Sequence, residues 1–195
     1  TEDYKAKPKT HYGISKLKAE EYILSKEIPK CKKVYILRPC MIHGKGNKGN
    51  LNLLYQLVSK KIPWPLGSFD NLRSFCSIEN LLFVIKEFSE RDDIPSGIYN
   101  IADDDSLSTN ELIGLIAESQ NIKSRILNIP KKIIKNLAKI GNKLRLPLNS
   151  ERLQKLTESY VVDNNKIKTV LGKEFPISTK QGLLKTFESF KGNRR

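Results

Sequence analysis

The sequence predicts an α/β fold, and three observations carry that prediction. A short apolar run of β-branched and aromatic residues at positions 34–37 is typical of a strand buried on both faces of a parallel sheet. Ser108 with Glu111, and Ser178 with Gln181, have the spacing of a capping box, which opens a helix. Segments of strand type and helix type alternate along the chain, which is the pattern of α/β proteins.

A helix is predicted close to the first residue. Thr10 stands where an N-cap is expected, after a polar segment that contains Pro8. The helix would run to about Glu27, and Pro29 would end it. Its apolar stripe consists of Ile14, Leu17, Leu24 and Ile28.

Residues 44–49 satisfy the pattern G-x-G-x-x-G, and Asp70 lies 21 residues beyond the last glycine. This would be a dinucleotide-binding fingerprint if a strand directly preceded it and another strand followed. The context disagrees, because Pro39 and four further residues precede the first glycine and because segment 62–66 carries two prolines. We therefore expect a flexible Gly/Lys loop before a helix at about 50–59, whose N-terminal amides could face a phosphate.

The second half of the chain continues the alternation. We expect, in order, a strand at 73–78, a helix at about 79–90, a strand at 98–101, a helix from 108 to about 120, a short helix from 163 to 172 and a C-terminal helix from 178. Asp163 and Gly172 are the cap and the stop signal of the short helix.

The charge is unusual for a chain of this size. The 195 residues include 35 Lys and Arg against 21 Asp and Glu, which gives a net charge of +14 at pH 7. Such a charge favours anionic partners, namely phosphates, nucleic acid or a membrane surface. Most of it is lysine, which is also typical of a solvated surface, so charge alone does not select a partner.

Cysteine and histidine usage indicates neither disulfides nor a metal site. Cys31, Cys40 and Cys76 form no C-x-x-C motif, and the histidines are His11 and His43. Reduced thiols fit a cytoplasmic protein. No apolar run is long enough to span a bilayer, and the first residues are charged and polar.

A basic amphipathic segment lies at 130–144, within a stretch from 119 to 150 that has no acidic residue and eight basic ones. Its apolar side consists of Ile133, Ile134, Leu137, Ile140 and Leu144, and its lysines are largely opposite. Such a helix can lie on an anionic membrane or bind an acidic partner. The favoured alternative is a surface helix whose apolar stripe packs on the core.

The segment 12–16 places a phenol and an ammonium on one helix face, since Tyr12 and Lys16 are four residues apart. A nearby cation lowers the pKa of a phenol and prepares it for proton transfer. Spacing alone is weak evidence, because Tyr22 and Lys26 repeat it.

Taken together, these pieces resemble the extended short-chain dehydrogenase/reductase family, specifically its NAD-dependent nucleotide-sugar epimerases, dehydratases and 4-ketoreductases. The resemblance covers nearly the whole chain in the right order. The matching runs are Thr1 to Asp3 before Pro8, Tyr12 to Lys16 with Ala19 and Glu20, Leu37 to Pro39 before Gly44, Gly49 with Asn50, Pro65 to Ser68, Arg73 to Phe75 with Asn80 and Leu81, and Asp163 through Lys166 to Gly172. The residues after Tyr12 also select this tyrosine over Tyr22.

The resemblance implies the C-terminal remnant of a Rossmann-type parallel sheet plus a small α/β substrate-binding lobe. Residues 1–48 would be the last part of the dinucleotide-binding domain. Residues 49–195 would be mostly the substrate-binding lobe, with about 68–105 returning to the Rossmann sheet. The family's Gly-rich cofactor loop and catalytic Ser/Thr would precede Thr1, so we expect this to be part of an enzyme, inactive alone and unable to hold NAD tightly.

The resemblance also implies roles for single residues. Tyr12 would transfer a proton at a sugar hydroxyl, Lys16 would hold the nicotinamide ribose of NAD or NADP, and Pro39 would lie at the nicotinamide. The substrate, a nucleotide-diphosphate sugar, would be bound by Asn50, Leu51, Leu66, Arg73, Arg152 and Tyr160. A homodimer is expected.

The reaction type stays open. Met41 stands where classical 4-epimerases carry a substrate-contacting Asn, and His43 replaces their usual Tyr. A UDP-sugar 4-epimerase is the first interpretation, and a 4-ketoreductase of surface-polysaccharide synthesis is the alternative. From other classes, a basic module that binds nucleic acid or an anionic membrane, and a structural dimerisation piece, also fit the sequence.

Overall fold

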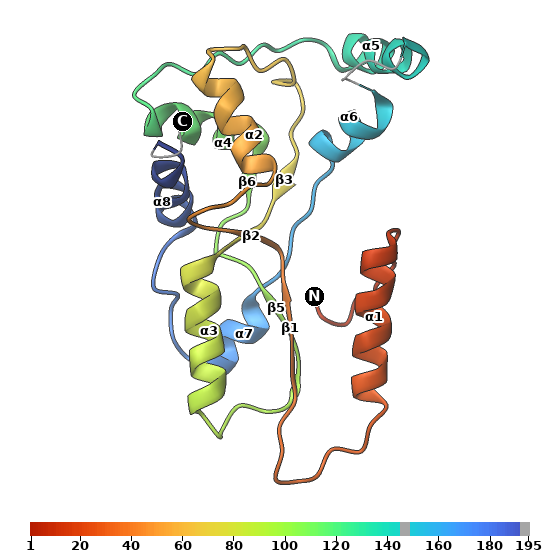
Figure 1. The fold of residues 1–195 in the computed structure, drawn as a ribbon, viewed down its shortest axis with the longest axis vertical. Coiled ribbons are helices and arrows are strands. Elements are labelled where there is room, and N and C mark those ends of the chain that lie inside the picture. The colour runs from red at the N-terminus through yellow and green to blue at the C-terminus, as the bar shows by residue number, and fades with distance from the viewer. Residues whose placement is uncertain (145–148, 192–195) are drawn as a thin grey trace.

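The structure is a computed structural model that describes residues 1–144 and 149–191 (Figure 1). The strands are β1 (Tyr35–Pro39), β2 (Met41–His43), β3 (Leu72–Arg73), β4 (Phe75–Ser77), β5 (Gly97–Ile101) and β6 (Leu107–Ser108). The helices are α1 (His11–Leu24), α2 (Asn50–Ser59), α3 (Ile78–Glu90), α4 (Thr109–Ser119), α5 (Lys131–Leu144), α6 (Ser150–Thr157), α7 (Asn165–Leu171) and α8 (Thr179–Lys191). The alternation confirms the predicted α/β class.

The described strands form three two-stranded sheets, and two of these are parallel. β1 pairs with β5 from Tyr35 opposite Gly97 to Pro39 opposite Ile101, and β2 pairs with β4. Both pairs are parallel, whereas the short β3 and β6 are antiparallel. Cys40 separates β1 from β2, and its N–H donates to the Ile101 carbonyl at 3.0 Å. The predicted strand at 73–78 is split, because Ser74 leaves the ladder between β3 and β4.

Helix ends largely follow the local signals. The Thr10 hydroxyl accepts the Gly13 N–H at 3.1 Å and caps α1, although α1 ends at Leu24 rather than near Glu27. Ser108 and Glu111 form the predicted capping box of α4, with distances of 3.1 and 2.7 Å. The prediction for Asp163 was wrong in detail, since Asn164 is the N-cap residue of α7 while the Asp163 carboxylate accepts the Asn165 N–H.

The core consists of two clusters of buried apolar side chains. The first joins α2, α4 and α8, with Leu51, Ile116 and Phe187 among its most buried members. The second joins α3 and α7 to the β1–β5 pair, around Val84 and Tyr99. Figure 1 shows the two groups of helices at opposite ends of the molecule. This division into two clusters does not test the predicted domain boundaries, which stay a prediction.

The first helix stands apart from both clusters. No residue of α1 is buried, and Figure 1 shows α1 separate from the helices around the β1–β5 pair. One ion pair connects it to the strands, in which Arg38 donates from Nε and Nη2 to Glu20 at 2.5 to 3.2 Å. Within the described residues, no helix is long and apolar enough to cross a membrane.

The loop at 44–49 corrects one argument from the sequence. β2 ends at His43 and α2 begins at Asn50, so a strand does directly precede the glycines and a helix follows them. The fingerprint is nevertheless absent, because Asp70 lies before β3 rather than at the end of a following strand. The Gly49 amide is also engaged, since it donates to Oδ1 of Asn47 at 2.9 Å.

Candidate functional site

The Tyr12–Lys16 pair forms as the helical spacing predicts. The Lys16 ammonium lies 5.5 Å from the centroid of the Tyr12 ring, and Tyr12 is 73% exposed. Tyr22 and Lys26 form the same arrangement at 4.3 Å. Within the described residues, no hydrogen bond or ion pair connects the side chains of Tyr12 and Lys16 to another predicted site residue. Both are thus open to a ligand.

Pro39 ends β1, next to the segment that leads into α1. The Glu2 carboxylate accepts the Asn100 N–H at 2.8 Å on the neighbouring strand β5. Arg38 lies beside Pro39, and its hydrogen bond with Glu20 raises its pKa, with smaller contributions from the charges of Glu20, Glu2 and Tyr160. These charges hold the carboxyl end of β1 close to α1.

Arg73 is a partly buried cation with spare donor capacity. Its Nη2 donates to the Lys155 carbonyl, and its Nε is buried without a hydrogen-bond partner among the described residues. Burial lowers the pKa of Arg73, and the charge of Glu158 acts against this. A buried guanidinium with an unsatisfied N–H is suited to an anionic ligand.

Tyr160 lies beside Arg73 through backbone pairing. The Tyr160 N–H donates to the Leu72 carbonyl at 2.8 Å, and the Ser74 N–H donates to the Tyr160 carbonyl at 2.9 Å. The Tyr160 side chain is exposed. Arg152 lies on the exposed surface of α6, where its N–H donates to the Asn149 side chain at 2.8 Å. The structure thus places Arg73 and Tyr160 together.

The other three predicted substrate contacts begin or flank α2. Asn50 opens the helix, and its N-cap residue is Gly49. The side chains of Leu51 and Leu66 are buried in the first core cluster, so only their backbone atoms can face a ligand there. Gly67 follows Leu66 in a crowded place, where a Cβ would lie 2.3 Å from the Asn128 side chain.

The residues present fit only part of a dinucleotide site. Tyr12, Lys16 and Pro39 could hold the nicotinamide end, because the first two are exposed and the third ends a parallel strand. The loop at 44–49 does not offer a free set of amides, since Asn47 accepts the N–H of Gly49. Within the described residues, no group of three or more His, Cys, Asp or Glu is placed to hold a metal ion.

Comparison with known proteins shows which enzymes the chain is similar to. No family model matches the chain. A UDP-glucose 4-epimerase of Vibrio cholerae is 31% identical over 191 residues, which are 97% of this chain and 56% of that protein. A 4-epimerase of Escherichia coli O157:H7, named for N-acetyl-α-D-glucosaminyl-diphospho-ditrans,octacis-undecaprenol, is 28% identical over 96% of this chain and 59% of its own length. The chain is a partial match to the family of NAD-dependent nucleotide-sugar epimerases and dehydratases.

The chain spans about half the length of the curated relatives it matches. Its fold agrees with this family as well. The Bordetella bronchiseptica enzyme WbmG in complex with NAD superposes with a TM-score of 0.68 at 17% identity, over 98% of this chain and 53% of that one. The α/β architecture of the chain therefore corresponds to about half of a larger known structure.

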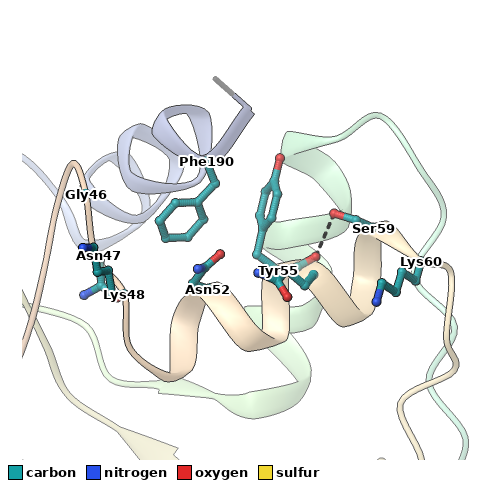
Figure 2. Close-up of a pocket in the computed structure, with 9 residues that line it drawn as sticks. Gly46, Asn47, Lys48, Asn52, Tyr55, Ser59, Lys60 and Phe190 are labelled. Carbon is teal, nitrogen blue, oxygen red and sulfur yellow. Dashed lines mark hydrogen bonds between the residues drawn. The ribbon is translucent and has the colours of Figure 1, made fainter. Parts of the chain in front are cut away.

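A cavity of about 740 Å³ lies on the flank of α2 (Figure 2), and it is lined by Gly46, Asn47 and Lys48 of the loop at 44–49 but by none of the predicted site residues. Figure 2 shows Tyr55 and Phe190 facing it from α2 and α8, with Asn52 and Ser59 along α2. The sequence analysis missed this cavity. The available signal was the polar spacing of Asn52, Gln56, Ser59 and Lys60 on one side of a helix.

A buried polar cluster joins the two core clusters of the chain, and sequence reasoning missed it too. His43 contacts Thr186 through Nδ1 at 2.9 Å and Asp103 through Nε2 at 3.4 Å. Asp103 also accepts the Ser77 N–H at 3.0 Å and the Asn80 side-chain N–H at 2.8 Å. Because its members satisfy one another away from solvent, this cluster organises the fold rather than a ligand.

Proposed function

We propose that this chain supplies the proton-transfer pair and the substrate-binding part of an NAD-dependent UDP-sugar 4-epimerase. The observation that carries the proposal is the 31% identity with the Vibrio cholerae UDP-glucose 4-epimerase over 97% of the chain. The motif residues stand in the family's order, and the structure leaves Tyr12 and Lys16 exposed on one helix face.

Tyr12 moves a proton at the C4 hydroxyl oxygen of the sugar. NAD, which Lys16 and Pro39 would help to hold, would supply hydride transfer at the sugar carbon. Lys16 favours the phenolate of Tyr12, because a positive charge stabilises the ionised form of a neighbouring phenol, and it would donate hydrogen bonds to the ribose of a bound cofactor.

Arg73 binds the substrate diphosphate. Its buried Nε lacks a hydrogen-bond partner among the described residues, and a guanidinium donates bidentate hydrogen bonds to phosphate oxygens. The N-terminal amides of α2, at Asn50 and Leu51, are a second place where an anion is stabilised. Tyr160 flanks Arg73 and contributes to the same end of the site.

The chain offers a matched test, because it contains the Tyr-Lys spacing twice. In the protein as encoded, Tyr12→Phe should lower kcat for C4 epimerisation of UDP-glucose by about 10²- to 10⁴-fold, the range for loss of a general acid/base. Tyr22→Phe removes the equivalent hydroxyl one helical segment later and should leave turnover unchanged. Turnover is measured by the interconversion of UDP-glucose and UDP-galactose, and NAD content by absorbance.

The result that contradicts this proposal is full epimerase activity in Tyr12→Phe, or equal loss in both variants.

A 4-ketoreductase is the second candidate, favoured by Met41 at the position of the Asn in classical 4-epimerases. It would consume reduced cofactor stoichiometrically instead of interconverting the two sugars. The Escherichia coli relative suggests that a lipid-linked N-acetyl sugar be assayed beside UDP-sugars.

A further inference from the structure

Helix α5 carries an apolar stripe that is not part of the core. The favoured interpretation of the sequence was that its apolar residues pack on the core, but of these only Ile134 is buried, together with the small Ala138 and Gly141. The other four are exposed, with accessible fractions of 50% for Ile133, 48% for Leu137, 51% for Ile140 and 65% for Leu144. Their spacing of four, three and four residues places them along one line of the helix.

Lysines border this stripe on its outer side. At 3.6 residues per turn, Lys132, Lys139 and Lys143 lie on the side of the helix opposite the buried residues. This side adjoins one edge of the exposed stripe. All three are exposed, and none forms an ion pair within residues 1–144 and 149–191. No acidic residue occurs between 119 and 150. The face is therefore apolar and cationic at once.

The position of α5 makes this face available. Figure 1 shows α5 at an outer corner of the molecule beside α6, far from α1. Asn142 fixes the contact with α6, since its side chain exchanges two hydrogen bonds of 2.9 Å with Ser150. Ile134 and Leu153 anchor the two helices in the first core cluster. The stripe is thus held outward on a fixed helix.

The combination of features selects the occupant. A nucleic acid would engage the lysines but leave four apolar side chains in water. A second copy would bring two rows of lysines together on chains that each carry a charge of +14. A bilayer with anionic headgroups satisfies both parts, because the apolar stripe enters the headgroup boundary while the lysines face the lipid phosphates.

We propose that the exposed face of α5, formed by the stripe and its three lysines, docks the protein on an anionic membrane surface. The helix lies in the plane of the interface, with an axis of about 21 Å for its 14 residues. This inference goes beyond the proposed function and does not depend on which sugar is bound. Its readout is vesicle binding, so its failure is distinct from a failure of the epimerase assay.

The first experiment removes apolar contact without removing charge. The purified protein is floated with phosphatidylcholine vesicles that contain or lack phosphatidylglycerol. Binding is expected to the anionic vesicles, and Leu137→Gln with Ile140→Gln should weaken it at least about tenfold, since each side chain loses burial in the interface. The control Leu82→Gln with Ile85→Gln removes two exposed apolar residues from α3 and should change nothing.

The second experiment removes charge without removing apolar contact. Replacing Lys132, Lys139 and Lys143 by Gln should weaken binding by roughly fivefold per lysine, as expected for basic residues close to an anionic leaflet. The control replaces Lys5, Lys7 and Lys9 by Gln and changes the net charge equally. Circular dichroism and the Tm confirm that each variant folds, because all of these side chains are exposed.

The proposal is overturned by several results. One is absence of binding to anionic vesicles, and another is equal loss of binding in the matched controls, which would mean attraction by net charge alone. Light scattering that shows the α5 variants converting a dimer to a monomer would assign the face to a second copy. Binding of RNA or DNA that survives the Leu137 and Ile140 changes but not the lysine changes would assign it to nucleic acid.

Discussion

A single buried carboxylate connects distant parts of the chain. Asp103 follows β5, and its oxygens accept hydrogen bonds from the N–H of Ser77 and the side-chain N–H of Asn80, where β4 gives way to α3. His43 extends the connection to Thr186 on α8. Asn80 adds a further link by donating to the Ile177 carbonyl at 3.0 Å. Removing the carboxylate would leave several of these donors buried without a partner.

The Asp103→Ala variant should therefore lose about 3 kcal/mol of unfolding free energy, because each unsatisfied buried donor costs on the order of 1–3 kcal/mol. Urea denaturation followed by circular dichroism measures the loss. Asp105→Ala is the matched control, since Asp105 is exposed and its carboxylate takes part in no hydrogen bond or ion pair within the described part of the chain. An Asp103→Ala variant as stable as this control would mean that the cluster contributes little.

Local signals predicted the residues whose partners lie close in sequence. The hydroxyls of Thr10 and Ser108 each accept the N–H of a residue three positions later, so both partners of the interaction lie within four residues of sequence. Asp103 is different, because His43 lies 60 residues before it and Asn80 lies 23 before it. No periodicity marks such a contact, which arises only when β4 and α8 meet beside β5. Tyr12 and Lys16 were predictable as a pair, but it was not predictable that, within the described part of the chain, no hydrogen bond or ion pair would join their side chains to another candidate residue.

At the scale of elements, α1 differs from every other helix of the described chain, because none of its residues is buried. Its apolar residues include Ile14, Ile23 and Leu24, all exposed. An isolated helix of 14 residues is only marginally stable in water, since nucleation is costly and tertiary packing normally supplies the stability. The Thr10 cap and the Arg38–Glu20 ion pair are its main supports. Helical periodicity predicted this element but could not show that its stripe meets no core.

Hydrogen exchange should separate α1 from the packed helices. In α4, five residues are buried and a complete capping box closes the first turn, so its amides should exchange only through large-scale unfolding. The α1 amides should open locally and exchange at least about 100-fold faster. Mass spectrometry of peptides from 11–24 and 109–119 after deuterium labelling makes the comparison. Equal protection of the two helices would indicate that another surface, from a longer protein or a second copy, covers α1.

Across the whole molecule, basic residues outnumber acidic ones by 35 to 21, and some of the acidic side chains form ion pairs that connect separate elements. Hydrogen bonds to Lys173 lower the pKa of Glu87, with Arg91 adding to the effect, and Arg91 lowers the pKa of Asp93 to about 2. The Glu87 carboxylate lies 2.8 Å from the Lys173 ammonium and so links α3 to the end of α7. Arg91 strengthens the same junction by donating to the Leu171 carbonyl at 2.8 Å. These pairs hold the second core cluster closed.

The stability of the protein should therefore fall in acid, and Glu87→Gln isolates one contribution. A carboxylate whose pKa is lower in the folded state stabilises the fold above its unfolded pKa, and this is lost as the pH falls through the folded value. The Tm of the unmodified protein should be flat near neutral pH and fall from about pH 5 toward pH 2. Glu87→Gln should lower the Tm at pH 7, and the difference from the unmodified protein should shrink as the pH falls through the lowered folded pKa of Glu87. The general repulsion among 35 basic residues acts on both proteins and cancels in the difference.

Glu90→Gln is the control, because Glu90 is exposed on the same helix and forms no ion pair in the described residues. Its Tm difference from the unmodified protein should therefore not change with pH. A constant difference between Glu87→Gln and the unmodified protein would refute a role for the Glu87 charge in holding α3 against α7.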